Sequence, residues 1–143
     1  MKAVSNFQTN MMESSNYSDK MLILVVEDDD ISYFLVREIL SSLGLESIRA
    51  KTKNETLQII SEHKDLRLMI LDIMLMGSEN GYVIASELAS KQVDLPIVVV
   101  SAWDVSVLNP KPTINKNIIA VMEKPLNIGD FKKNMIEVLE LGV

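Results

Sequence analysis

Three acidic side chains of this sequence stand where apolar segments end. Glu27 and Asp28 directly follow the apolar run Met21 to Val26, and Asp72 follows the apolar residues Leu68 to Leu71. Adjacent acids can simply cap the next helix. Capping needs one carboxylate, however, and charged neighbours repel each other unless a cation lies between them. Three carboxylates at one edge of a sheet would form the oxygen-rich site that Mg2+ prefers.

Two further polar residues stand at the ends of apolar segments. Ser101 ends the segment that begins at Ile97, and Lys124 follows the run Ile118 to Met122. Each has an ordinary alternative, since serine can cap a helix and lysines usually lie in solvent. Beside three carboxylates, a hydroxyl and an ammonium group are suited to bind an anion. With Mg2+, they would stabilise a phosphoryl group during its transfer to a carboxylate nucleophile, which would become an aspartyl phosphate.

The composition excludes several other kinds of site. The chain has no cysteine, which rules out disulfides, thiol nucleophiles and thiolate zinc sites. Its single histidine, His63, precedes the third strand and so lies at the opposite edge of the sheet, which argues against a Ser-His-Asp hydrolase. A net charge of -6 argues against a broad basic face, so we expect no direct nucleic acid binding.

Five short segments, four of them largely apolar, would place these side chains. Unbroken apolar runs are typical of strands that are covered on both faces. The predicted strands are Met21 to Val26, Glu46 to Ala50, Leu66 to Asp72, Ile97 to Ser101 and Ile118 to Met122. Because helix-like segments alternate with them, the sequence predicts an α/β fold with a parallel sheet and right-handed crossovers. The carboxyl ends of such strands form the ligand-binding edge.

The segments between the strands carry apolar residues at helical spacing. The first predicted helix has Asp30 as its N-cap and stops at Gly44. Its predicted inward residues are Ile31, Phe34, Leu35, Ile39 and Leu43. The next two helices are predicted from Asn54 to His63, facing inward with Leu57 and Ile60, and from Tyr82 to Lys91, facing inward with Ile84 and Leu88. The last is predicted to bury Ile128, Phe131, Met135, Val138 and Leu139.

Two segments depart from this regular pattern. Asp104 to Asn117 should form the fourth helix, but Pro110 and Pro112 interrupt it, so we expect a short or irregular connection. Residues 1–20 show no apolar periodicity and are predicted to be a flexible tail before one domain, residues 21–143. No signal peptide pattern or membrane-length apolar run is present, so we expect no membrane association and a cytoplasmic protein.

Four motifs in this order resemble the receiver domain of two-component response regulators. They are L-I-L-V-V-E-D-D, L-M-I-L-D-I-M-L, V-V-V-S-A and E-K-P-L, and the match extends from Met21 to the C-terminus. Each motif alone is weak, but the ordered set is specific. The resemblance implies a flavodoxin-like, doubly wound five-stranded sheet in the order 2-1-3-4-5. It also implies a single-domain, stand-alone receiver that acts by binding other proteins.

The resemblance implies a role for each acidic residue. Asp72 corresponds to the phosphoacceptor, and Asp28 to the direct Mg2+ ligand with Glu27 as the supporting acid. Met74 would add its backbone carbonyl to the metal. The phosphoryl group would come from a histidine kinase or a histidine phosphotransfer protein, and a downstream protein of unknown identity would detect the change.

The basic and hydroxyl residues also have counterparts in the family. Lys124 corresponds to the lysine that contacts the phosphoryl group, and the family implies a cis bond between it and Pro125. Ser101 corresponds to the switch hydroxyl, followed by the small Ala102. We therefore expect no enzyme in the usual sense, only self-catalysed acceptance and slow loss of a phosphoryl group.

Several residues differ from the family pattern. Met76 replaces a common proline, and the loop Gly77 to Gly81 is about one residue longer than the commonest form. Val121 stands where an aromatic switch residue is usual. With Pro110 and Pro112, this favours an alternative function, an interaction module that works without phosphorylation. A Mg2+-dependent phosphatase is a third reading, but Met74 stands where its second aspartate would be.

The lifetime of the phosphoryl group depends on the residues around it. Met74 and Trp103 flank the expected phosphoryl position with large apolar groups, where polar residues often assist the attacking water. This predicts slow self-dephosphorylation. Alternatively, Trp103 simply packs under the irregular connection.

Overall fold

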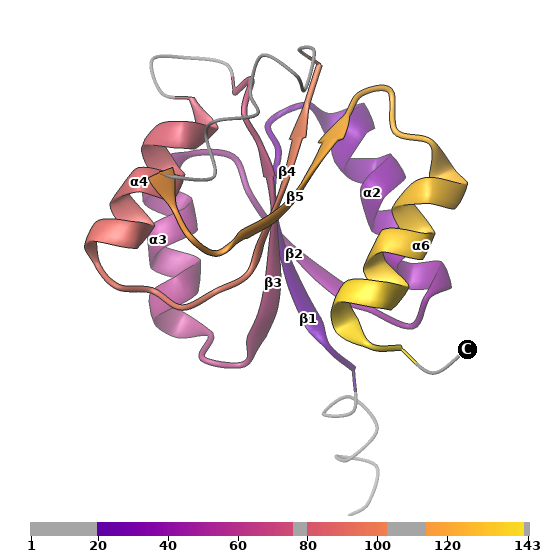
Figure 1. The fold of residues 1–143 in the computed structure, drawn as a ribbon, viewed down its shortest axis with the longest axis horizontal. Helices are drawn as coiled ribbons and strands as arrows, with labels where there is room; N and C mark the ends of the chain where they lie inside the picture. The colour runs from indigo at the N-terminus through magenta and orange to yellow at the C-terminus, as the bar shows by residue number, and fades with distance from the viewer. Residues whose placement is uncertain (1–19, 76–79, 103–113, 142–143) are drawn as a thin grey trace, which may run out of the picture.

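The computed structural model describes residues 20–75, 80–102 and 114–141. Within these residues five parallel strands form one sheet in the order β2-β1-β3-β4-β5 (Figure 1). The strands are β1 (Leu22–Val26), β2 (Glu46–Ala50), β3 (Leu66–Asp72), β4 (Ile97–Ser101) and β5 (Ile118–Glu123). The helices are α2 (Asp30–Ser42), α3 (Lys53–Glu62), α4 (Gly81–Ser90) and α6 (Ile128–Leu139). The predicted fold class and strand order are confirmed.

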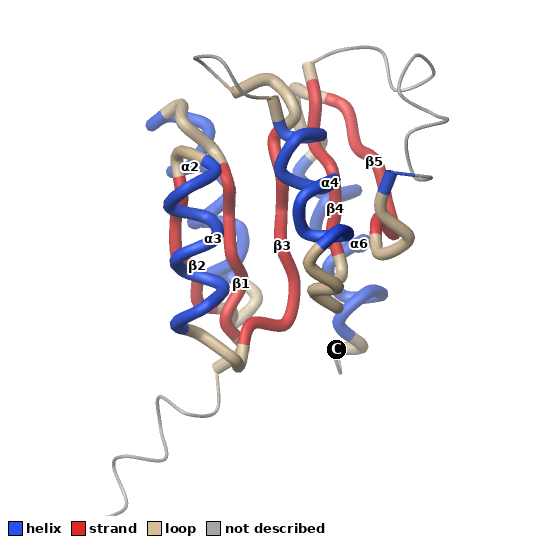
Figure 2. The backbone as a smooth tube through the Cα atoms, turned by 90° about the vertical axis from the view of Figure 1, so that its left-hand side faces the viewer, coloured by secondary structure: helices blue, strands red, loops and turns tan. Residues whose placement is uncertain are grey.

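Helices cover both faces of the sheet, as the unbroken apolar strands require. Figures 1 and 2 show α2 and α6 on one face and α3 and α4 on the other. The core divides in the same way: Leu40 of α2 and Phe131 of α6 belong to one cluster, whereas Ile84 and Leu88 of α4 belong to the second. All five residues of β4 are buried. No helix in the described part of the chain has the length and apolarity that crossing a membrane would require.

The apolar face of α2 differs from the prediction. Ile31, Phe34 and Leu35 were expected to face inward, but they are 81%, 54% and 39% exposed. The buried residues are Val36, Ile39 and Leu40. The reason is geometric: each residue turns a helix by 100°, so a face centred on Val36 and Leu40 places Phe34 nearly opposite the core. The first turns of α2 therefore present an apolar surface to solvent.

The predicted start of α2 was wrong by one residue. Asp29, not Asp30, is the N-cap, and its Oδ2 accepts a hydrogen bond from the backbone N–H of Ser32 at 2.8 Å. Asp30 is the first helical residue and pairs with Arg49 instead. At the other end, Gly44 follows the helix with a φ of 78°, a left-handed conformation that favours glycine. The predicted stop is confirmed.

The other helices agree more closely with the predicted pattern. Both α3 and α4 begin and end one residue earlier than expected, after the N-caps Thr52 and Asn80. Of the inward residues predicted for α3, Leu57 and Ile60 are only partly buried against the core. In α6, the buried residues are Phe131, Met135 and Leu139, with Val138 partly buried against the same cluster.

One residue of the predicted α6 face was wrong, and two predicted segments lie outside the described residues. Ile128 is the first residue of α6 and is 48% exposed. Residues 1–19 of the predicted tail and residues 103–113 of the predicted irregular connection are not described.

Candidate functional site

The carboxyl ends of four strands bring the predicted site residues together. Glu27 directly follows β1, Asp72 ends β3, Ser101 ends β4 and Lys124 follows β5. The backbone links these ends, since Lys124 N–H donates to the Ser101 carbonyl at 2.7 Å. Glu27, Asp72 and Lys124 border an open depression of about 400 Å³, whereas Ser101 is not part of its lining. Its lining comprises Glu27, Asp28, Asp29, Asp72, Met74, Ala102 and Lys124.

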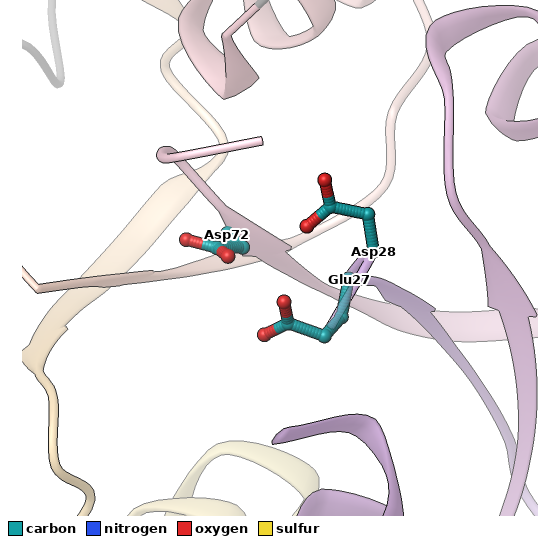
Figure 3. A group of neighbouring side chains, drawn as sticks. All are labelled: Glu27, Asp28 and Asp72. Carbon is teal, nitrogen blue, oxygen red and sulfur yellow. The ribbon is translucent and has the colours of Figure 1, made fainter. Parts of the chain in front are cut away.

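Three carboxylates meet in this depression. Glu27, Asp28 and Asp72 each offer an oxygen, and these oxygens all lie within 4.8 Å of one another. Figure 3 shows the three groups turned toward a common space. Glu27 and Asp72 are each only 4% exposed, and Asp28 is half-buried. Oxygens that share one Mg2+ at about 2.1 Å lie roughly 3 to 4 Å apart, so this donor set fits the ion.

Lys124 joins two of these carboxylates. Its ammonium donates to Glu27 Oε1 at 2.7 Å and to Asp72 Oδ2 at 3.2 Å. The Lys124–Pro125 bond is cis, as expected from the resemblance. Since one ammonium faces three carboxylates, the cluster carries more negative than positive charge.

The Asp72 carboxylate is held at both oxygens. Oδ1 accepts a hydrogen bond from the backbone N–H of Met74 at 3.0 Å, while Oδ2 accepts from Lys124. The side chain of Met74 is 42% exposed and lies at the border of the depression. Ser101 is completely buried at the end of β4. The site residues predicted from the sequence are therefore neighbours in the fold, with Ser101 beneath the surface.

The comparison with family models decides what kind of domain this is. The model of the response regulator receiver domain matches residues 23–136. This chain belongs to the receiver domain family of response regulators. The match covers the five strands except for Leu22, together with most of α6, so it includes every site residue described above.

Solved structures share the fold of this receiver at low sequence identity. A CheY-like receiver domain protein from Methanospirillum hungatei is 23% identical with a TM-score of 0.74, over 85% of this chain and 95% of that chain. The response regulator TrrA from Thermotoga maritima, solved in complex with Mg2+-BeF, is 24% identical with a TM-score of 0.71, over 82% of this chain and 98% of that chain. At these identities the likeness shows the fold.

A curated relative matches over a shorter stretch. The uncharacterized transcriptional regulatory protein YrkP of Bacillus subtilis is 46% identical over 55 residues, which make up 38% of this chain and 23% of the relative. The match therefore spans about a quarter of that relative's length.

Burial and charge shift the protonation of the receiver's site. Burial raises the pKa of the Glu27 carboxyl, and the charge of Asp72 adds to this effect, although the hydrogen bond from Lys124 opposes it. Burial alone would lower the pKa of the Lys124 ammonium, but the hydrogen bond to Glu27 and the charges of Asp72 and Glu27 outweigh it, so that pKa is raised. Both shifts have the direction that excess negative charge produces.

Two residues that support the site were not predicted from the sequence. The guanidinium of Arg49, in β2, donates to the backbone carbonyl of Glu27 at 2.9 Å. Gly81 begins α4 directly behind Asp72, and a Cβ atom there would lie 2.5 Å from the Asp72 carbonyl oxygen. A lone arginine in the short strand E-S-I-R-A and a glycine at a helix start are the signals that could have indicated them.

The positions that depart from the family pattern are only partly described. Val121 is half-buried in β5 and packs against the core cluster shared with α4. Met76 and Trp103, and with them residues 77–79 of the long loop, lie outside the described residues.

Proposed function

We propose that this receiver accepts a phosphoryl group on Asp72 in a Mg2+-dependent reaction and signals through protein contacts. The observation that carries the proposal is the environment of Asp72. Its carboxylate is nearly buried, is oriented by the Met74 N–H and lies beside both the Lys124 ammonium and two further carboxylates. A single carboxylate is thus held in one orientation, next to a cation and a cluster of hard oxygen ligands.

The donor in this proposal is a phosphohistidine on a histidine kinase or phosphotransfer protein. An Asp72 oxygen attacks phosphorus, the P–N bond to the donor imidazole breaks, and the imidazole leaves with the bonding electron pair and takes up a proton. When the Lys124 ammonium leaves Asp72, it can neutralise negative charge on the phosphoryl oxygens. Mg2+ would be held by Glu27, Asp28, Asp72 and the Met74 carbonyl, and it would help to neutralise the charge on the phosphoryl oxygens. Ser101 would donate its hydroxyl to the phosphoryl group.

An exposed apolar patch on α2, formed by Ile31, Phe34 and Leu35, supports a protein donor. The three residues are 39% to 81% exposed, and Ile31 is three positions from Asp28. Spacing of three and four residues places them on one side of the helix. Apolar side chains at the border of a charged site are suited to a protein surface that brings its phosphohistidine to Asp72.

The receiver is proposed to act as a switch and not as a turnover enzyme. Asp72 would accept one phosphoryl group at a time. It would lose this group slowly, because the Met74 side chain has no polar group to orient an attacking water. We expect this to occur in the cytoplasm, without direct nucleic acid or membrane binding by this domain.

A second function is favoured by one specific residue. Val121 packs against the core where the family usually has an aromatic side chain that moves. In this alternative, the fold binds its partner constitutively and phosphorylation does not alter the contact.

Intact mass tests whether Asp72 is a phosphoacceptor, the step on which the switch depends. The full chain is incubated with acetyl phosphate and Mg2+, beside Asp72→Asn and a sample with excess chelator. A gain of one phosphoryl group in the wild type alone supports the switch. No gain in a folded wild-type protein overturns it and leaves the constitutive module.

A further inference from the structure

Arg49 connects edge strand β2 to the acidic loop that follows β1. Its Nε donates to the carbonyl oxygen of Glu27 at 2.9 Å, and its Nη1 lies 2.8 Å from Asp30 Oδ1. One planar group therefore contacts the loop at two points. Asp28 and Asp29 form the short segment between those points. The position of the Asp28 backbone is restricted from both sides.

The guanidinium is itself fixed in place. It stacks on the ring of Tyr33, with 4.9 Å between Cζ and the ring centroid, and the Arg49 side chain is only 19% exposed. The Tyr33 hydroxyl lies 2.9 Å from Ser47 Oγ, so the ring is also tied to β2. These contacts distinguish Arg49 from a mobile surface arginine, because its guanidinium stacks on a ring and is held at two of its three nitrogens.

Stability alone explains this arrangement poorly. The Asp30 carboxylate is 81% exposed, and an ion pair with such a group contributes little. The third nitrogen of Arg49, Nη2, is buried without a hydrogen-bond partner among the described residues, which is unfavourable. A side chain kept at such a cost is expected where it serves a site.

We infer that Arg49 is a positioning residue that holds the Asp28 carboxylate in the geometry needed to bind Mg2+. The inference rests on the metal site of the proposed function and adds a residue to it. Arg49 is not among the residues that line the depression. Arg49 acts through its hydrogen bond to the Glu27 carbonyl and through its ion pair with Asp30, the first residue of α2.

The sign of the effect on metal affinity separates positioning from simple electrostatics. If Arg49 acted only as a positive charge, its removal would release the charge of Asp30 and strengthen the binding of a cation. If Arg49 positions Asp28, its removal must weaken that binding. Residues outside a metal's direct ligands that orient those ligands commonly change affinity by about 10-fold to 100-fold.

The test is Mn2+ affinity of the full chain, measured from the electron paramagnetic resonance signal of free Mn2+. We expect Arg49→Gln to raise the Kd at least fivefold. Arg49→Lys should raise it at least threefold, since one ammonium cannot reproduce both contacts. The matched controls are Arg37→Gln and Arg37→Lys on α2, where the arginine is 49% exposed and pairs with Glu38. Both controls should stay within twofold of the wild type.

The outcomes are distinguishable. The inference is overturned if the Mn2+ Kd of the Arg49 variants differs from that of the wild type no more than the Kd of the Arg37 controls does, or if it is lower than that of the wild type. The proposed function then remains intact. A wild type that binds no Mn2+ overturns both. If Arg49→Gln does not fold by circular dichroism, Arg49→Lys decides, because it keeps the charge and is milder.

Discussion

The ammonium of Lys124 lies 2.7 Å from a carboxylate oxygen of Glu27, although 97 residues separate them in the sequence. The same ammonium donates to Asp72, so one cation is shared between two nearly buried carboxylates. Asp28 adds a third carboxylate to the cluster. An ion pair thus links the residues that follow β1 and β5, the first and last strands in the sequence, at the edge where we expect phosphorylation to occur.

Removal of Lys124 should make the stability of the protein depend more strongly on metal. We expect Lys124→Met to lower the free energy of unfolding of the metal-free protein by about 2 kcal/mol, less than the roughly 3 to 5 kcal/mol for fully buried pairs. The lower value reflects the 22% exposure of the Lys124 side chain. Because Mg2+ would supply the missing positive charge, it should stabilise the variant more than the wild type in urea unfolding.

The control for this prediction is Lys133→Met, which removes the same charge from an exposed position of α6. It should unfold like the wild type with and without Mg2+. Equal stabilisation by Mg2+ in Lys124→Met and Lys133→Met would contradict the prediction.

The raised pKa of Glu27 predicts a pH dependence of the metal-free protein. Burial and the charge of Asp72 raise this pKa above 4.5 in the folded state. The folded protein then binds a proton that the unfolded chain has released, so stability falls as the pH rises from 4.5 through the raised value. Glu27→Gln should remove this fall. Urea unfolding of both proteins in chelator across that range tests it, and a difference that does not change with pH would argue against it.

The close approach at Gly81 predicts a large effect of one methyl group. In Gly81→Ala, the new Cβ would lie 2.5 Å from the Asp72 carbonyl oxygen and 2.9 Å from Ile73 Cα, so the backbone must shift. We expect a loss of about 2 kcal/mol or more in the free energy of unfolding. Gly129→Ala in α6 is the control, since its Cβ would meet only the Asn127 side chain at 3.4 Å. If both variants unfold alike, the backbone at Asp72 is less restricted than the structure indicates.

Met74 should slow the loss of the phosphoryl group. Its side chain borders the depression beside Asp72 and carries no group that can orient water. Met74→Asn should therefore speed dephosphorylation severalfold, measured as loss of the phosphorylated mass after the donor is removed. The Met74 N–H that orients Asp72 remains in this variant, so phosphorylation itself should persist. Loss within seconds from the wild type, with Mg2+ present, would refute the slow lifetime.

The apolar patch on α2 should affect phosphoryl transfer from a protein donor but not from a small-molecule donor. Ile31→Ser is expected to change stability by less than about 0.5 kcal/mol, as is usual for surface positions. Phosphorylation by acetyl phosphate should be unchanged, whereas transfer from a histidine kinase that phosphorylates the wild type should slow. Leu40→Ala on the buried face of the same helix should instead cost about 2 to 5 kcal/mol. Unaltered transfer to Ile31→Ser would exclude the patch from docking.

Strand positions could be predicted because they need only local information. Runs such as Ile97 to Val100 are apolar without interruption, and a strand covered on both faces requires that pattern. The parallel order then placed the strand ends, and with them Asp72 and Lys124, at one edge of the sheet. That reasoning required no knowledge of side-chain contacts.

Features that depend on packing could not be predicted in the same way. The sequence around α2 has apolar residues on several sides, and only the position of the sheet decides that Leu40 is buried and Phe34 is exposed. Asp29 and Asp30 are chemically equivalent as caps until Arg49 pairs with the second. That pairing joins residues of different elements, and no periodic pattern in the sequence records it.

The pairing of Glu27 with Lys124 has a consequence for synthesis of the chain on the ribosome. Because the residues after β1 emerge early and those after β5 emerge late, the three acidic residues leave the ribosome before Lys124 does. A nascent chain that lacks the segment around Lys124 would hold two carboxylates close together without that neutralising charge. We therefore expect this edge of the sheet to reach its final arrangement only after β5 has joined the sheet.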